Sequence, residues 1–180
     1  MNVETNFPLL DELLGSWSEQ LGPDLIAYRN HCCRMLNFCL ALAPGITAEE
    51  REQLVIAAAF HDLGIWSDGT IDYLPPSVRR AQAYLNARGK AAWIPLVDRL
   101  IDEHHKLRAY KDAGFPLAEV FRKADLVDVS LGLVRFGLPG GYVKAVKAQF
   151  PNEGFHKKLM RLAGGWFKGH PLSPPPFIKW

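Results

Sequence analysis

The sequence predicts an all-α fold in the form of a single-domain helical bundle. Apolar residues recur at helical spacing along most of the chain, and the runs end at Gly or Pro signals. No stretch alternates between apolar and polar residues over the length of a strand, and no internal repeat is present. The chain has 180 residues, of which 48% are hydrophobic and 22% charged, so one domain with a substantial core is expected.

The first half of the chain contains two strongly indicated helices. Residues 23 to 43 place apolar side chains on most turns and are followed by a Pro-Gly pair. Thr47 and Glu50 then have the spacing of a capping box, which opens a second helix that runs to about His61. Gly64 is expected to end that helix.

The remaining helices follow a turn-rich stretch, SDGTIDYLPPS. We expect Ser77 to cap a helix that runs to Gly89, and Pro95 to lie in the first turn of a helix that ends at the pair His104-His105. After the segment KDAGFP, the pattern predicts a helix that carries Val120, Phe121, Leu126 and Val129, weaker helices over residues 141 to 150 and 154 to 167, and an extended tail, HPLSPPPFIKW.

Composition indicates which partners and which cellular compartment are expected for the protein. The net charge of +2 gives no reason to expect nucleic acid as a partner. Cys32, Cys33 and Cys39 crowd one helical segment without a CxxC pattern, so we interpret them as buried small hydrophobic residues. The N-terminus lacks a basic region followed by a long apolar stretch, and no run reaches the ~18 apolar residues of a membrane span. A cytoplasmic protein without membrane contact is therefore expected.

The C-terminal region is basic. Its last forty residues contain seven Lys or Arg residues and one acidic residue. This pattern fits either a solvated helix face or a basic rim that attracts an anionic ligand. The final residues, PPPFIKW, also offer apolar groups that would suit packing on a second copy in a homodimer.

Four ionisable side chains lie on or at the ends of separate predicted helices: His31, His61 followed directly by Asp62, and Asp125. Each alone has an ordinary explanation, because a helical histidine is often a hydrogen-bonded core residue and an aspartate near a helix end is often a cap. If the helices form a bundle, however, these imidazoles and carboxylates converge. A cation then compensates the cost of burying them.

The order of these residues resembles the HD superfamily, which is named for its adjacent His-Asp pair. The similarity covers residues 25 to 135 and is carried by AAAFHDLG, by the upstream His31 and by ADLVD around Asp125. That superfamily is all-α, and most of its characterised members are metal-dependent phosphohydrolases. The resemblance implies that one divalent ion, of manganese, iron, cobalt, nickel, zinc or magnesium, is bound by His31, His61, Asp62 and Asp125.

The same resemblance divides the chain into three parts. Residues 1–24 would form an N-terminal helical segment and residues 25–137 the HD-domain core. Residues 138–180 would supply C-terminal helices and a Pro-rich tail that pack on the same domain.

A narrower similarity links HHKLRAYKDAGFPLAEVFRKADLVD to the HD-GYP group of cyclic-dinucleotide phosphodiesterases. In that group His-His-Glu precedes Gly-Tyr-Pro and the aspartate helix, whereas here Lys106 replaces the glutamate and Gly-Phe-Pro replaces the tripeptide. The group's further histidine is absent, because no histidine lies between the HD pair and His104. His104 and His105 therefore have three roles open to them: a second metal site bridged by Asp62, contact with a phosphate, or capping of a helix end.

The resemblance implies hydrolysis of a phosphate ester, such as a nucleotide or another small phosphorylated metabolite, by a metal-activated water. Asp62 would position or deprotonate that water, and His104 and His105 are further catalytic candidates. Trp66 and Tyr73 flank the turn-rich stretch, where they either stack on a base or belong to the core or a lid. Basic side chains that suit the phosphate, although surface solvation also explains each of them, are Lys106, Arg108, Lys123, Arg79 and Arg80.

Other functions remain open from the sequence. Some HD-fold proteins are di-iron oxygenases, which need two irons and normally the histidine that is absent here. A non-catalytic HD-fold module that senses a nucleotide or a partner would have no need of a water-activating site. A plain helical bundle whose histidines hydrogen-bond to one another is the remaining interpretation.

Overall fold

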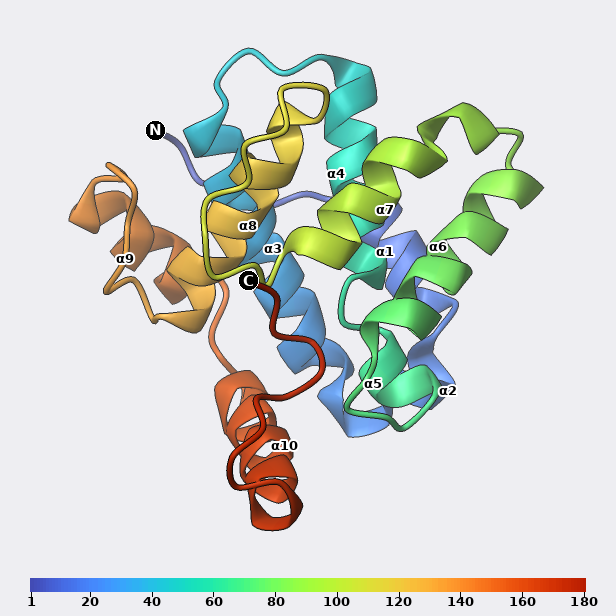
Figure 1. The fold of residues 1–180 in the computed structure, drawn as a ribbon. Coiled ribbons are helices and arrows are strands. Elements are labelled where there is room, and N and C mark those ends of the chain that lie inside the picture. Colours follow the sequence, from blue (N-terminus) through green and yellow to red (C-terminus); the bar gives the residue numbers. More distant parts are fainter.

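The computed structural model describes all 180 residues and is helical throughout, which confirms the predicted all-α fold. A single parallel bridge between Lys106 and Lys179 is its only β-type pairing. The α-helices, drawn in chain order in Figure 1, are α1 (Pro8–Gly15), α2 (Ser18–Leu21), α3 (Leu25–Leu42), α4 (Ala48–Phe60), α5 (Gly64–Ser67), α6 (Leu74–Ala87), α7 (Ile94–Glu103), α8 (Pro116–Val129), α9 (Gly140–Gln149) and α10 (Phe155–Gly169). Short 3-10 helices precede α3 (Gly22–Asp24) and α7 (Ala91–Trp93).

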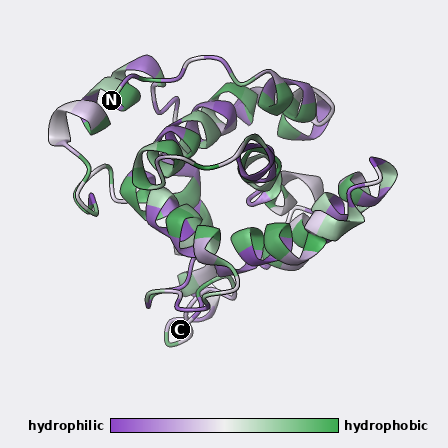
Figure 2. Ribbon diagram, turned by 90° about the horizontal axis from the view of Figure 1, so that it is seen from above, coloured by the Kyte–Doolittle hydropathy of each residue, from purple (hydrophilic) through white to green (hydrophobic).

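Helix α3 is the centre of the bundle. It packs against α8 and α4, and α7 in turn contacts both α4 and α8 (Figure 1). Almost every α3 residue from Ala27 to Cys39 is buried, so this helix has neighbours on all sides. The three cysteines are free and buried, as predicted. Seen from above, the hydrophobic residues gather where the helices face one another (Figure 2).

The predicted capping box fixes the start of α4. The Thr47 hydroxyl accepts a hydrogen bond from the backbone N–H of Glu50 at 3.1 Å, and the Glu50 carboxylate accepts one from the backbone N–H of Thr47 at 2.8 Å. Helix α4 then runs through an alanine-rich buried segment and ends at Phe60, with His61 as its C-cap. The chain therefore delivers His61 and Asp62 to the interior at a defined helix end.

Gly64 and Ser77 have roles that differ from those predicted. Gly64 does not simply end α4 but begins the short helix α5. Helix α6 begins at Leu74, with Tyr73 rather than Ser77 as its N-cap, four residues earlier than expected, because prolines suit a first helical turn. Ser77 therefore lies inside α6, and its hydroxyl accepts a hydrogen bond from the backbone N–H of Gly64 at 3.0 Å. The two helices meet closely, since a Cβ on Gly64 would lie 2.4 Å from the carbonyl oxygen of Tyr73.

The C-terminal elements lie outside the central helices. Helices α9 and α10 occupy the two weakly predicted regions, and α10 projects at one end of the molecule (Figure 1). The tail after α10 contains turns at residues 171–172 and 176–177, rather than being extended throughout, and it comes back toward α7 (Figure 1). It is fastened there by a hydrogen bond from the Leu107 N–H to the Lys179 carbonyl at 2.8 Å and by an ion pair between Lys179 and Asp102.

None of the helices combines the length and the apolar composition that crossing a bilayer requires.

The close contact between α5 and α6 predicts that a single methyl group added at Gly64 lowers the stability of the fold. Gly64→Ala should lower the free energy of unfolding by about 2 kcal/mol, because the added Cβ would overlap the Tyr73 carbonyl and displace α6. Urea denaturation followed by circular dichroism measures this change. The control is Gly165→Ala in α10, where a Cβ meets nothing within 4 Å and the better helix former should leave stability equal or higher. Equal effects of the two substitutions would contradict the tight contact.

Candidate metal centre

Four side chains that are far apart in the sequence meet in the core. His31 comes from α3, His61 and Asp62 follow α4, and Asp125 comes from α8. All four are buried, with at most 3% of each residue exposed. The His31 Nε2 atom lies 3.0 Å from His61 Nε2, 3.6 Å from Asp125 Oδ1 and 3.8 Å from Asp62 Oδ2. The structure thus brings together the four residues that the sequence singled out.

The histidine pair after α7 joins this cluster. His104 Nε2 lies 3.5 Å from Asp62 Oδ1, and His105 Nδ1 lies 3.6 Å from Asp125 Oδ2. His104 is buried, whereas 16% of the His105 side chain is exposed. Three overlapping sets of ligand atoms, each within 4.8 Å, can hold a metal ion: His31, His61 and Asp125; His61, Asp62 and His104; and His104, His105 and Asp125.

The orientation of the three buried imidazoles is set from outside the cluster. In each ring the Nδ1 atom is hydrogen-bonded to an oxygen acceptor, which leaves Nε2 as the atom that faces the cluster. The acceptors are Asp128 Oδ2 for His31 at 2.7 Å, the Ala58 carbonyl for His61 at 2.8 Å and the Ile101 carbonyl for His104 at 2.6 Å. A neutral ring that donates from Nδ1 carries a lone pair on Nε2.

These lone pairs point at other acceptors. The Nε2 atoms of His31 and His61 face each other at 3.0 Å, so neutral rings in this tautomer repel unless a proton or a cation lies between them. Asp62 Oδ1 and His104 Nε2 are buried and neither has a hydrogen-bond partner. Buried acceptors without a donor are costly, and a cation satisfies all of them at once. The nitrogen and oxygen donors therefore fit a divalent transition-metal ion.

Burial also shifts the protonation of the cluster. It lowers the pKa of His31 to about 4, so that this imidazole stays neutral over the physiological range. Burial raises the pKa of Asp125 to about 8. For Asp62, burial acts in the same upward direction, but the neighbouring imidazoles of His61 and His104 outweigh it and hold the pKa well below its ordinary value. One carboxylate thus stays ionised while the other keeps a proton at neutral pH.

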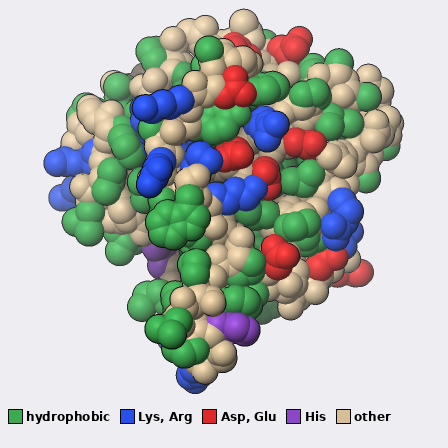
Figure 3. Space-filling view, viewed as in Figure 1, with side chains coloured by type: hydrophobic (Ala, Val, Ile, Leu, Met, Phe, Trp, Pro, Cys, Tyr) green, Lys and Arg blue, Asp and Glu red, His purple; other side chains and the backbone are tan.

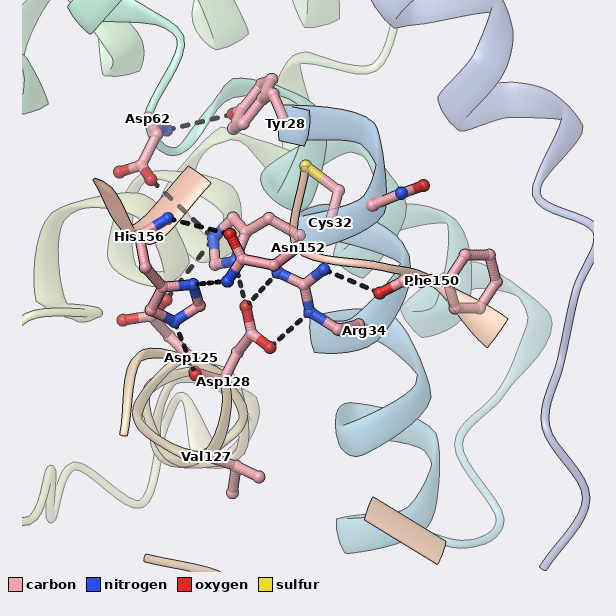
Figure 4. Close-up of polar contacts among 12 residues, drawn as sticks. Tyr28, Cys32, Arg34, Asp62, Asp125, Val127, Asp128, Phe150, Asn152 and His156 are labelled. Atoms are coloured by element: carbon pink, nitrogen blue, oxygen red, sulfur yellow. Dashed lines mark hydrogen bonds and ion pairs between the residues drawn. The ribbon is translucent and has the colours of Figure 1, made fainter. Parts of the chain in front are cut away.

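A second layer of buried groups holds His31 in place. Asp128 accepts two hydrogen bonds from the Arg34 guanidinium, at 2.5 and 2.8 Å, in addition to the one from His31 (Figure 4). Arg34 also donates to the Phe150 carbonyl at 3.0 Å, which ties the end of α9 to α3. On the other side, the ring of Phe155 stacks on His31 with 4.0 Å between the centroids. The His31 ring therefore has little freedom to turn.

Tyr28 holds the end of α4 in place, as Asp128 and Phe155 hold His31. Its hydroxyl accepts a hydrogen bond from the backbone N–H of Asp62 at 3.2 Å (Figure 4) and contacts the carbonyls of Ala58 and Ala59. Tyr28 thereby satisfies backbone groups left open where α4 ends, and it fixes the position of the HD pair.

Tyr73 is the side chain by which the turn-rich segment reaches the cluster. It is buried, and its hydroxyl lies 2.5 Å from His105 Nε2. With the phenol as donor, His105 Nε2 is the acceptor, so a neutral His105 carries its proton on Nδ1, the atom that lies 3.6 Å from Asp125 Oδ2. Burial, followed by the charge of Asp62, raises the pKa of Tyr73 well above its usual value, so the phenol keeps its proton.

The other substrate-binding candidates have partners of their own. Lys106 pairs with Glu103 at 3.3 Å, Lys123 with Glu119 at 3.5 Å and Arg80 with Asp68 at 2.8 Å, while Arg79 and Arg108 are exposed. The structure thus places these cations against carboxylates outside the cluster. The Trp66 ring packs at a tilt of 41° against Tyr28, with 4.8 Å between centroids, and its ring nitrogen donates a hydrogen bond to Asp24 at 2.9 Å.

Sequence reasoning missed the residues of the supporting layer. Asp128 stands three residues after Asp125, in the segment ADLVD, so both carboxylates lie on one face of α8. That spacing was a usable signal. Arg34 and Tyr28 carried no signal of their own, because a helical Arg or Tyr fits many surroundings.

The converging lone pairs predict that a divalent ion stabilises the fold. Saturating Mn²⁺, at about 100 times its dissociation constant, should raise the melting temperature by about 5 to 10 °C. Asp125→Asn should weaken this shift with the helical content retained, since one ligand oxygen becomes an amide. Differential scanning fluorimetry measures the shift and far-UV circular dichroism the helical content. A wild-type protein whose melting temperature ignores divalent ions would contradict the site.

Metal affinity should depend on pH in a specific range. Because the pKa of Asp125 is raised to about 8, a metal ion has to displace a proton from this carboxyl group below that pH. Affinity for Mn²⁺ should therefore rise about tenfold per pH unit from about pH 6 and level off above about pH 8. Isothermal titration calorimetry over this range tests the slope. A flat profile, as an aspartate with an ordinary pKa would give, would count against the burial of Asp125.

No protein-family model, no curated protein and no solved structure matches this chain. The feature of this chain that points to a function is the cluster of buried His and Asp side chains.

Proposed function

We propose that the protein is a divalent-metal-dependent phosphohydrolase that cleaves a phosphate ester. One observation carries the proposal: buried imidazoles whose Nε2 atoms are turned toward one another and toward two buried carboxylates. A proton shared by His31 and His61 would satisfy only that pair, whereas a cation would also satisfy Asp62 Oδ1 and His104 Nε2, which are buried without a hydrogen-bond partner.

The chain supplies two neighbouring sets of ligands. His31, His61 and Asp125 form one group of potential ligands. With Asp62 they would hold one ion, as the resemblance to the HD superfamily implies. His104 and His105, together with Asp125, would hold a second ion or contact the phosphate. In either arrangement the hydrogen bonds to Nδ1 of His31, His61 and His104 keep these three rings in the tautomer that binds metal.

A bound divalent ion would polarise the phosphoryl oxygen and lower the pKa of a water molecule to near neutrality. Asp62 Oδ1, which is buried and has no hydrogen-bond partner, would accept the proton of that water as it attacks phosphorus. The ester P–O bond then breaks, and the departing alkoxide takes a proton. Tyr73 and His105 form the donor pair at the exposed edge of the cluster and would supply it.

The direct test combines metal content with activity. Asp62→Ala should lose bound metal and lose at least about a hundredfold in the hydrolysis of an active substrate, because it removes both a ligand and the base. Elemental analysis of protein purified without chelator, with a panel of phosphate monoesters and diesters, provides both readings.

The matched control is Asp72→Ala. Asp72 is an exposed carboxylate in the turn-rich segment, and its removal should leave metal content and turnover unchanged. If Asp62→Ala binds metal like the wild type, or if the metal-loaded wild type hydrolyses no phosphate ester, the proposed function is wrong.

A di-iron oxygenase is the second candidate, and the ligand group of His104, His105 and Asp125 favours it, because such an enzyme needs two ions. Two irons per chain and substrate-dependent oxygen consumption would support it over hydrolysis. One ion per chain, or full activity with manganese in the absence of oxygen, would exclude it.

A further inference from the structure

An apolar pocket lies directly beside the exposed edge of the metal-binding cluster. It has a volume of about 260 Å³, and nine of the ten residues that line it are hydrophobic. Leu159, Leu162 and Ala163 of α10 form one wall, and Phe177 and Ile178 of the tail form another. Figure 3 shows hydrophobic side chains over the part of the molecule where α10 and the tail project.

The pocket shares His105 and Tyr73 with the cluster. Both residues line it, and they carry its only side-chain polar groups. The Phe177 ring lies 5.0 Å from the ring of His105 and 5.3 Å from that of Tyr73. Among the His and Asp side chains of the cluster, only that of His105 is more than 5% exposed. A ligand from solvent therefore meets the cluster at the place where the pocket opens onto it.

The tail holds this wall in place. The Lys179 carbonyl accepts a hydrogen bond from the Leu107 N–H at 2.8 Å, and the Lys179 ammonium pairs with Asp102 of α7. These contacts fix the tail at Lys179, the residue directly after Ile178. Leu107, which donates the hydrogen bond, lies two residues after His105. The apolar wall is thus attached to the same segment that carries His104 and His105.

We propose that the substrate of this site is a phosphate monoester of an alkyl or aryl alcohol, whose apolar group fills the pocket while its phosphate reaches the cluster past His105 and Tyr73. This inference rests on the proposed function and names its substrate class. Cavities of about 150 Å³ with apolar linings already bind benzene, so this pocket accepts an aromatic ring or a chain of several carbons. A nucleobase would leave its polar edges without partners among these walls.

Non-hydrolysable n-alkylphosphonates, from methyl to hexyl, test the pocket without turnover. In titration calorimetry with protein supplemented with manganese, affinity should rise about fourfold per added methylene until the pocket is full, with one ligand per chain. Equal affinity for methylphosphonate and hexylphosphonate, or no binding of either, would overturn the inference.

Two substitutions in α10 locate the binding. Ala163→Phe should fill the pocket. The ratio of the affinity for hexylphosphonate to that for methylphosphonate should fall at least tenfold, while metal content stays at the wild-type level. Gly165→Phe adds the same side chain to the same helix where a Cβ meets nothing within 4 Å, and it should bind hexylphosphonate like the wild type. If both variants keep the full chain-length dependence, the alkyl group binds elsewhere and the inference is wrong.

The two proposals can fail separately. Binding that depends on chain length, without hydrolysis of any alkyl phosphate, would overturn the phosphohydrolase and retain an apolar-ligand pocket. Hydrolysis of methyl, butyl and hexyl phosphate with equal kcat/KM would retain the phosphohydrolase and overturn the pocket as its specificity site.

Discussion

The close approach of two imidazole Nε2 atoms, one from α3 and one from the end of α4, is the constraint on which the centre of this protein depends. At 3.0 Å the Nε2 atoms of His31 and His61 repel unless positive charge lies between them, and both rings are held in this orientation by hydrogen bonds to Nδ1. Four helical elements converge at this point, because α8 brings Asp125 and the end of α7 brings His104. A cation at the cluster would therefore stabilise the packing of the bundle as well as serve chemistry.

The surrounding layer explains how such a cluster survives in a hydrophobic core. The ion pair of Arg34 and Asp128 is buried, and an isolated pair of this kind adds little to stability once the cost of removing it from water is counted. Its value here is orientation. Asp128 sets the tautomer of His31, Arg34 binds the segment after α9, and Phe155 covers the remaining face of the ring. The C-terminal third of the chain is thus part of the construction of the cluster, and it also provides the apolar pocket.

Sequence patterns predicted what depends on local geometry. The Thr47–Glu50 capping box placed the start of α4, and from there helical periodicity carried His61 and Asp62 to a buried helix end. The roles of Gly64 and Ser77 were misjudged, because they depend on how closely α5 approaches α6, a tertiary contact that no local pattern encodes. The same holds for the pocket. Its walls come from α10, from the tail and from Tyr73, and hydrophobic residues in three separate segments do not reveal that they face one space. The family resemblance, the metal and the chemistry remain predictions.

The most direct measurement is anomalous diffraction from crystals grown with manganese, recorded on both sides of the manganese absorption edge. We predict an anomalous peak bonded to Nε2 of both His31 and His61 and to carboxylate oxygens of Asp62 and Asp125, with the Nδ1 atoms still hydrogen-bonded to Asp128 and Ala58. Crystals that bind manganese only at surface carboxylates, or a His31 ring turned so that Nε2 leaves the cluster, would contradict a metal centre in this protein.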